Sequence, residues 1–440
     1  TLAGLLCSAV HMMVYSILSI SLITVAQEFQ LTWAQRGFIL SAFSLTYSIF
    51  QIPGGFFVMK YGPYIGPMFA SCGSCLALIV IPIAVHIFGA GDKGAIVAIF
   101  YCNMLFLGFL GAGYNPAFHD IIAHKVPISS RSFVHNLVYS GQQLGAVVAT
   151  VGVAASIGAF GWRVTYVIAG SICFFVGITW RLLVNRQMPN VDNSGPHENQ
   201  VTEDGEPATV VFTTYEKWRT VLTSPAFLVI CLNHFGSVWI SRVAMNWGPT
   251  FLHTREGIEF SDLGYLAALP RLLGFFVVSG SGSLTLYLIQ ARHWTVASVR
   301  KFMQAIGMGL PALLLIWMNY ETSTFLVIAL LLSSSALTGL TFGGYHCNHI
   351  DIAPDPNMAS LMYSITNTIG QLPGVIEPLI DSSILEFHSK LDPSTHTAAN
   401  PSQAAWSTIW FIIVAVSAFC IFFWLLFCRG VPIVLVKRRG

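Results

Sequence analysis

The sequence predicts an all-α membrane protein in which twelve transmembrane helices form two six-helix bundles related by pseudo-symmetry. Composition is the first reason, because 55% of the 440 residues are hydrophobic and only 9% are charged, too few to cover a soluble globule. The second is that twelve apolar runs reach the length of about 20 residues that a bilayer span needs. The third is one long polar segment, residues 185–223, which separates six runs from the other six.

The twelve runs give the predicted spans in chain order. They fall near residues 2–27, 36–59, 65–88, 95–122, 133–158, 163–184, 224–252, 262–289, 299–319, 323–350, 358–384 and 404–428. The polar segment holds charged and turn-forming residues with almost no apolar surface, which favours a solvated linker. We therefore divide the chain into an N-terminal bundle (1–184), a polar cytoplasmic linker (185–223) and a C-terminal bundle with a basic cytoplasmic tail (224–440).

Basic residues outside the span centres predict the orientation. With both termini cytoplasmic, the inner loops and tails hold Lys60, Lys125, Arg131, Arg181, Arg186, Lys217, Arg219, Arg292, Arg300, Lys301, Arg429, Lys437, Arg438 and Arg439. The outer loops then hold Arg36, Lys93, Arg163, Arg255 and Lys390. This asymmetry predicts an integral multi-pass protein with cytoplasmic termini, in either the plasma membrane or an organelle membrane.

An internal repeat supports two equivalent halves. Three pairs of similar strings occur in the same order with similar offsets: 36–43 with 263–270, 113–120 with 344–351, and 137–140 with 361–364. A parallel repeat of two six-helix halves is typical of secondary transporters whose binding site lies between the halves, near the bilayer midplane.

Two arginines inside predicted spans are candidate substrate-binding residues. Arg242 lies about ten residues before the outer end of span 7, and Arg271 about nine residues after the outer start of span 8. At a rise of 1.5 Å per residue, both are roughly 14 to 15 Å deep and level with each other. Two guanidiniums at one depth suit a carboxylate or phosphate between them. The alternative is that one or both form structural ion pairs or cap a helix break.

A buried carboxyl is a candidate for ion coupling. Glu377 lies about six residues before the outer end of span 11, beside Pro378. A desolvated carboxyl at this depth can exchange protons with the transport path. The alternative is a fixed ion pair with one of the arginines.

Histidine and aspartate close equivalent spans in the two halves. His119 and Asp120 end span 4, and His346, His349 and Asp351 end span 10. This placement suggests proton coupling by His119, Asp120 and His346 and gating by His349 and Asp351, although such residues also cap helices and bind loops.

Two further histidines lie inside predicted spans, and the sequence lacks the common motifs of enzymes and metal sites. His11 and His234 lie on apolar spans, where a lone histidine more often packs than binds. We find no metal-ligand spacing, nucleotide-binding loop or nucleophile–base pattern in a loop that could host chemistry. The sequence therefore predicts no enzyme, no cofactor and no metal site.

Several strings resemble the anion:cation symporter family of the major facilitator superfamily. They are 35–37 (QRG), 51–55 (QIPGG), 222–227 (LTSPAF), 299–304 (VRKFMQ), 348–354 (NHIDIAP), 367–370 (NTIG) and 373–374 (PG). The resemblance covers nearly the whole chain, and 348–354 is its most specific string. It implies the major facilitator fold and secondary transport of organic or inorganic anions, driven by protons, sodium or the membrane potential.

The chain departs from this family at expected site positions. Where members typically carry an arginine in span 1, the chain has Tyr15, which we expect to contact substrate. Met104 and Gly111 replace the family's Arg and Glu in span 4, whereas its His is matched at His119. By this resemblance His119 is also a candidate substrate-binding residue.

Loop and second-half positions depart as well. In the loop between spans 2 and 3, Met59 stands where the resemblance leads us to expect an acidic residue. Lys60 and Gly62 follow it, and we expect these two residues to take part in gating. The second-half counterpart of that acid is Tyr287, and an arginine of the family's glutamate carriers corresponds to Ser237.

Together these observations favour a secondary active transporter for a small anion, phosphate or carboxylate, that works by alternating access. The expected partners are this anion, a coupling proton or sodium ion and the lipid bilayer, with no nucleic acid, and the expected state is a monomer. Two alternatives stay open: a carrier of a neutral or cationic solute on the same fold, and a sensor or scaffold that does not transport.

Overall fold

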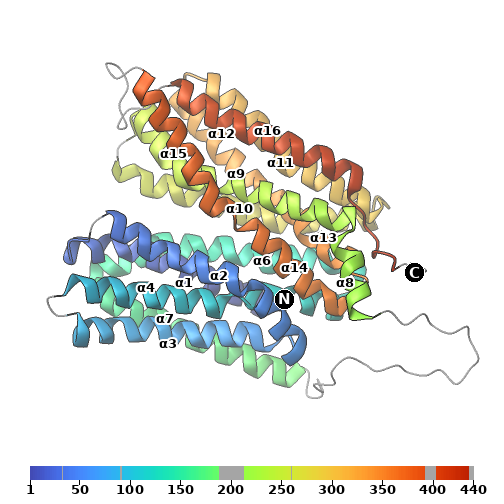
Figure 1. Ribbon diagram of the computed structural model, residues 1–440, viewed down its shortest axis with the longest axis horizontal. Coiled ribbons are helices and arrows are strands. Elements are labelled where there is room, and N and C mark those ends of the chain that lie inside the picture. Colours follow the sequence, from blue (N-terminus) through green and yellow to red (C-terminus); the bar gives the residue numbers. More distant parts are fainter. Residues whose placement is uncertain (32, 90–91, 188–212, 259, 392–402, 436–440) are drawn as a thin grey trace, which may run out of the picture.

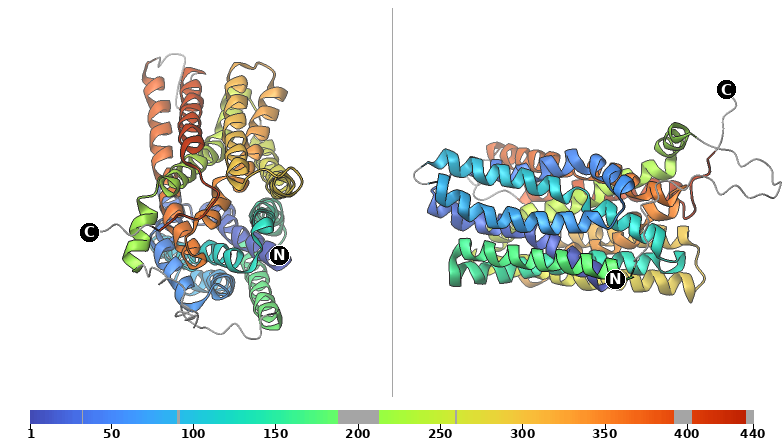
Figure 2. Two further views of the ribbon diagram at one scale, coloured as in Figure 1. Left: turned by 90° about the vertical axis from the view of Figure 1, so that its right-hand side faces the viewer. Right: turned by 90° about the horizontal axis from the view of Figure 1, so that it is seen from below.

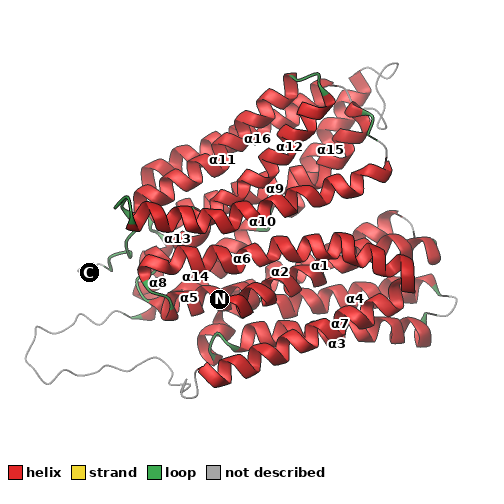
Figure 3. Cartoon of the chain, turned by 180° about the vertical axis from the view of Figure 1, so that it is seen from behind, coloured by secondary structure: helices red, strands yellow, loops and turns green. Residues whose placement is uncertain are grey.

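The computed structural model describes residues 1–31, 33–89, 92–187, 213–258, 260–391 and 403–435, and the regular structure in these ranges is helical (Figure 3). The first half contains α1 (Leu2–Glu28), α2 (Trp33–Tyr61), α3 (Ile65–Phe88), α4 (Lys93–Gly111), α5 (Tyr114–Lys125), η1 (Ile128–Ser130), α6 (Arg131–Val148), η2 (Ala149–Val153) and α7 (Ala154–Gln187). The second half contains α8 (Thr214–Leu222), α9 (Pro225–Glu256), α10 (Phe260–Gln290), α11 (Val296–Tyr320), α12 (Thr324–Leu337), η3 (Thr338–Gly343), α13 (Tyr345–Ile352), η4 (Pro356–Met358), α14 (Ala359–Gly370), α15 (Pro373–Leu391) and α16 (Gln403–Phe427).

Each predicted span is occupied by one long helix or by a run of shorter ones, which confirms the all-α prediction. Span 4 is divided into α4 and α5, span 10 passes from α12 through η3 into α13, and span 11 is divided into α14 and α15. Between spans 5 and 6, α7 bends at Gly161, whose φ of 77° is left-handed. Apolar composition predicts the length of a span but not a break inside it.

Close packing of small residues accompanies the break between α4 and α5. A Cβ on Gly54 of α2 would lie 2.9 Å from backbone atoms of Ala112 and Gly113. Only a residue without a side chain lets the two backbones approach this closely.

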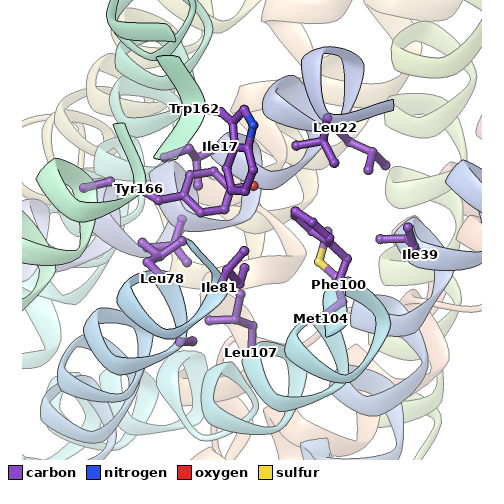
Figure 4. Packing of buried hydrophobic residues seen from close by; sticks show 14 of the residues in the cluster. Ile17, Leu22, Ile39, Leu78, Ile81, Phe100, Met104, Leu107, Trp162 and Tyr166 are labelled. Carbon is purple, nitrogen blue, oxygen red and sulfur yellow. The ribbon is translucent and has the colours of Figure 1, made fainter. Parts of the chain in front are cut away.

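The core of the first half lies among five helices (Figure 4). Phe100 and Leu107 of α4 pack among side chains of α1, α2, α3 and α7, including the buried rings of Trp162 and Tyr166. Lipid tails are as apolar as these side chains, so close packing rather than exclusion of water stabilises the bundle.

The two halves meet mainly along three helix pairs, α6 with α10, α2 with α14 and α5 with α14. We call the end of the molecule that carries Leu2 and Phe427 the inner end and the opposite end the outer end. The bundles lie side by side (Figure 2) and diverge towards the outer end (Figure 1).

The outer surface of the bundles is apolar. Large side chains such as Phe175 and Phe325 are 69% and 78% exposed. Within the described ranges, nine segments are long and apolar enough to cross a membrane. A chain with this surface is a multi-pass membrane protein.

Part of the predicted linker is helical. Residues 188–212, and Lys437, Arg438 and Arg439 of the predicted tail, lie outside the described residues. At the described ends of the linker, α7 extends to Gln187 and α8 begins after Thr213. Thr213 and Glu216 form a capping box that satisfies the first N–H groups of α8, a signal that composition alone does not reveal.

Candidate functional site

A cavity of about 370 Å³ lies between the two halves. Its lining extends from Leu252 and Leu266, near the outer ends of α9 and α10, to Asn115, Tyr363 and His346 in the middle of the molecule. The volume falls in the range of small-molecule sites. Polar lining side chains include His11, Tyr15, Tyr47, Asn115, Gln142, Gln143, His234, Ser237, Ser241, Arg242, Arg271, His346, Asn367 and Gln371.

Two cationic side chains line this cavity. Arg242 of α9 donates from Nη2 to Oε1 of Gln371 at 3.3 Å. Arg271 of α10 donates from Nη1 to Oε1 of Gln143, in the other half, at 3.4 Å. The two guanidinium charges are close enough to repel each other. An anion between them would remove this repulsion.

Hydrogen bonds connect Arg242 to the floor of the cavity. Gln371, which accepts from Arg242, donates to Oδ1 of Asn367 at 3.3 Å. The hydroxyl of Tyr47, in the first half, accepts from Asn367 at 3.4 Å and from Asn115 at 2.9 Å. The chain of contacts therefore runs from a cavity arginine to the interface between the halves.

A cluster of histidines and tyrosines lies beneath the cavity. His346 of α13 and His135 of α6 join the halves, with Nδ1 of His346 3.0 Å from Nε2 of His135. The ring of His119 stacks on Tyr363 at a centroid distance of 4.0 Å. Tyr139 packs against His135 at 4.5 Å. These rings close the cavity towards the inner end.

A buried ion pair lies further towards the inner end. Arg300 of α11 is 1% exposed and donates from Nε to Oδ2 of Asp351 at 2.6 Å. It also donates to the carbonyl of Gly343 at 2.9 Å and, across the interface, to the hydroxyl of Ser132 at 2.7 Å. The distribution of basic residues assigned Arg300 to an inner loop, whereas its side chain is buried inside the second half.

Four of the predicted site residues line the cavity, namely Tyr15, Arg242, Arg271 and His346. The ring of Tyr15 lies against that of Phe43, 4.7 Å between centroids. Both arginines line the same cavity, and their equal depth stays a prediction.

Other predicted residues lie below it. His119 is fully buried. Nε2 of His349 forms a hydrogen bond with the hydroxyl of Thr366 at 2.6 Å. Asp351 is the partner of Arg300. Asp120 is 3.4 Å from Nδ1 of His124 at the inner end.

Three predicted residues lie away from both groups. Glu377 is buried on α15 and lies outside the cavity lining. Its carboxyl group is close enough to interact with that of Asp381, one helical turn further along. Lys60 is exposed at the end of α2, with its amino group 5.1 Å from the ring of Tyr61. Gly62 follows with a φ of 85°, which favours glycine.

Sequence reasoning missed the uncharged floor and the partner histidine. Tyr47, Asn115, Asn367 and His135 belong to polar types that are common in membrane helices, and their spacing shows no ligand pattern. The repeat held one usable signal, because 137–140 matches 361–364, and these strings contain Tyr139 and Tyr363 of the ring cluster.

Residues 4–378 match the sequence model of the Major Facilitator Superfamily. The chain belongs to this superfamily. Its fold is similar to that of the superfamily transporter FucP in the outward conformation, with a TM-score of 0.65 over 95% of this chain and 98% of that one, at 16% identity. The predicted two-bundle fold of twelve helices is thereby confirmed.

Relatives within the superfamily are transporters. Vesicular glutamate transporter 1 of Bos taurus is 28% identical over 83% of this chain, which spans 65% of that protein. Sialin of Homo sapiens is 25% identical over 92% of the chain and 77% of its own length. The chloroplastic ascorbate transporter of Arabidopsis thaliana is 25% identical over 94% of the chain and 71% of its own length. The resemblance to the anion:cation symporter family is confirmed.

Proposed function

We propose that this protein carries a small anion, a carboxylate or phosphate, across a membrane by alternating access, and that Arg242 and Arg271 bind the anion. One observation carries the proposal: two repelling guanidiniums line the same cavity between the halves. Holding two like charges in one cavity is unfavourable, and an anion bound in that cavity would offset the repulsion. A planar fork of N–H donors matches carboxylate and phosphate oxygens.

The relatives support this substrate class. Their names specify glutamate and ascorbate transport, and both solutes are anions near neutral pH. Around the arginines, the amides of Gln143 and Gln371 and the hydroxyl of Tyr15 offer further polar contacts to a bound solute. The anion would therefore rest near the middle of the membrane, where rocking of the two bundles exposes it to either side.

We also propose proton coupling through His346. Of the four residues predicted for coupling, His346 alone lines the cavity. An imidazole ring can donate from one nitrogen and accept at the other, so it can pass a proton on. Its contact with His135 crosses the interface, which would link its protonation to the closure of the inner end. On this proposal the inner end faces the cytoplasm, as the distribution of basic residues predicts.

The test is uptake into proteoliposomes under an imposed pH gradient, sodium gradient or membrane potential, with phosphate, dicarboxylates, amino acids and sugars as candidate solutes. A hydrogen bond to a charged group contributes about 1.5–3 kcal/mol, so Arg242→Gln and Arg271→Gln should each reduce anion uptake by roughly 10- to 150-fold. Arg292→Gln is the matched control, because Arg292 is exposed and bonds to Tyr287 at 2.8 Å. It should leave uptake unchanged.

The alternatives are separate outcomes of the same experiment. Anion uptake that persists in both cavity variants would show that the arginines are structural. Uptake of only neutral or cationic solutes would replace the anion with another substrate class. Solute-dependent stabilisation of the purified protein without any uptake would indicate a sensor.

A further inference from the structure

Three histidines from three helices converge beneath the cavity. His119 of α5, His135 of α6 and His346 of α13 each present a ring nitrogen, and these nitrogens all lie within 4.8 Å of one another. The three side chains are 0%, 0% and 5% exposed. His119 and His135 belong to the first half and His346 to the second.

One of these three rings, that of His119, makes no hydrogen bond to the described residues. Among the described residues, neither ring nitrogen of His119 has a hydrogen-bond partner, although both are buried. Leaving a buried polar group unpaired is unfavourable. The two other nearby histidines differ, because His349 contacts Thr366 and a backbone carbonyl, and His234 contacts Thr366. Both nitrogens without a hydrogen-bond partner therefore belong to His119, a member of the group of three.

We propose that His119, His135 and His346 bind one divalent transition-metal ion of the zinc class. Neutral imidazole is a preferred ligand of such ions, and three ligands leave one tetrahedral position for water or another ligand. Tetrahedral bonds of 2.0–2.1 Å place ligand nitrogens about 3.4 Å apart. The contact between His135 and His346 is 3.0 Å, so these two rings need to tilt until both lone pairs face one position, and the His119 ring must approach the same position.

The surroundings fit a metal ligand set. With Oδ1 of Asn136 facing Nδ1 of His135 at 2.8 Å, the ring donates from Nδ1 and directs the lone pair of Nε2 towards His346. Such a contact on the second nitrogen is typical of metal-bound histidine. Metal binding would select this orientation over the swapped one, in which the Asn136 amide donates to Nδ1. In the His135–His346 hydrogen bond, one ring donates its N–H to the other ring. When the metal binds, the donor ring loses this proton and takes up a proton on its other nitrogen. Both facing lone pairs then bind the ion, and no ring changes its net charge.

Bound metal would hold the inner end closed. Its ligands come from both halves, and their separation on opening would break at least one metal–nitrogen bond. Because His346 lines the cavity, the ion can enter from the outer side while the inner end stays shut. The sequence did not predict this site because positions 119, 135 and 346 show no metal-ligand spacing.

The experiment uses the full chain without a histidine tag, purified in detergent and stripped with EDTA. After equilibration with Zn²⁺ alone and removal of free ion, elemental mass spectrometry measures zinc per chain, and a chelator competition gives Kd. We expect one equivalent in the wild type. Second-shell changes already cost 10- to 100-fold in affinity, so loss of a ligand in His119→Gln or His346→Gln should weaken binding by at least about 100-fold.

His86→Gln is the control, because His86 is an exposed residue of α3. It should keep full stoichiometry, and Zn²⁺ should raise the Tm of the wild type and this control but not of the two ligand variants. A wild type that binds less than about 0.1 equivalent at 100 μM Zn²⁺, or ligand variants that retain wild-type affinity, would overturn the proposal. No solute is present, so failure of anion transport leaves this result unaffected.

Discussion

The inner and outer ends of the molecule differ in how the two halves are held. At the outer end a cavity with two arginines separates the bundles. At the inner end the ion pair of Arg300 with Asp351 lies within the second half. Hydrogen bonds cross between the halves from Arg300 to Ser132, between His346 and His135, and between Asn136 and Ser281. The second half therefore contains a strong internal interaction at this end, whereas the polar contacts that join the halves there are weaker and can break during opening.

The largest effect is expected from breaking the strong interaction inside one half. Arg300→Met leaves the carboxylate of Asp351 buried without its partner. Removing one member of a buried pair costs about 3–5 kcal/mol, whereas Ser132→Ala removes one hydrogen bond to a charged group, worth about 1.5–3 kcal/mol. The free energy of unfolding in mixed detergent micelles should therefore fall more for Arg300→Met than for Ser132→Ala.

The double variant Arg300→Met with Asp351→Leu provides the control, because it removes both charges. It should recover most of the lost stability. Equal destabilisation by Arg300→Met and Ser132→Ala would contradict the division into strong contacts within a half and weak contacts between halves.

Depth along a helix could be predicted from the sequence, but direction around it could not. Counting residues placed Arg242 and Arg271 at one level, and both line one cavity. The same counting assigned Arg300 to an inner loop, whereas its side chain is buried against Asp351 of another helix. These outcomes depend on helix rotation and tilt, which packing against neighbouring helices determines.

The helix breaks were hidden for a related reason. Residues 338–343 lie inside a predicted span, yet they form η3. A Cβ on Gly344 would lie 2.9 Å from Cβ of Gln304. The break therefore depends on a close approach between two spans that are distant in the sequence.

A medium effect is expected at a close contact between the halves. A Cβ on Gly55 of α2 would clash with the hydroxyl of Ser364 on α14, so Gly55→Ala should disfavour closure of the inner end. Overpacking costs typically 1–3 kcal/mol, equivalent to a shift of about 5- to 150-fold in the open population. In a variant that retains only Cys347, which is fully buried at the inner end, maleimide labelling should accelerate accordingly.

Gly158→Ala is the matched control, since a Cβ there meets nothing within 4 Å. It should leave the labelling rate of Cys347 unchanged. The contact between Gly55 and Ser364 would not restrain opening if both alanine variants labelled at the same rate as their parent.

The smallest effect is expected at the outer end, where an exposed ion pair lies within the first half. Glu28 accepts from Arg163 at 2.6 Å and from Nε1 of Trp162 at 2.7 Å. Partial burial raises the pKa of Glu28, but these hydrogen bonds and the charge of Arg163 outweigh it and hold the pKa below its ordinary 4.5. A depressed pKa in the folded state stabilises the protein above pH 4.5, and this contribution is lost as the pH falls through the lower value.

Because the pair is solvent-exposed, Glu28→Gln should cost no more than about 1 kcal/mol near pH 7. The difference in unfolding free energy between wild type and variant should shrink below pH 4.5, and a constant difference down to pH 3 would exclude the ion pair as its cause. Labelling of Cys347 should be the same in both proteins, because Glu28 and Arg163 lie in the same half and their pair moves with it. A contact can thus stabilise the fold without restraining the opening of either end.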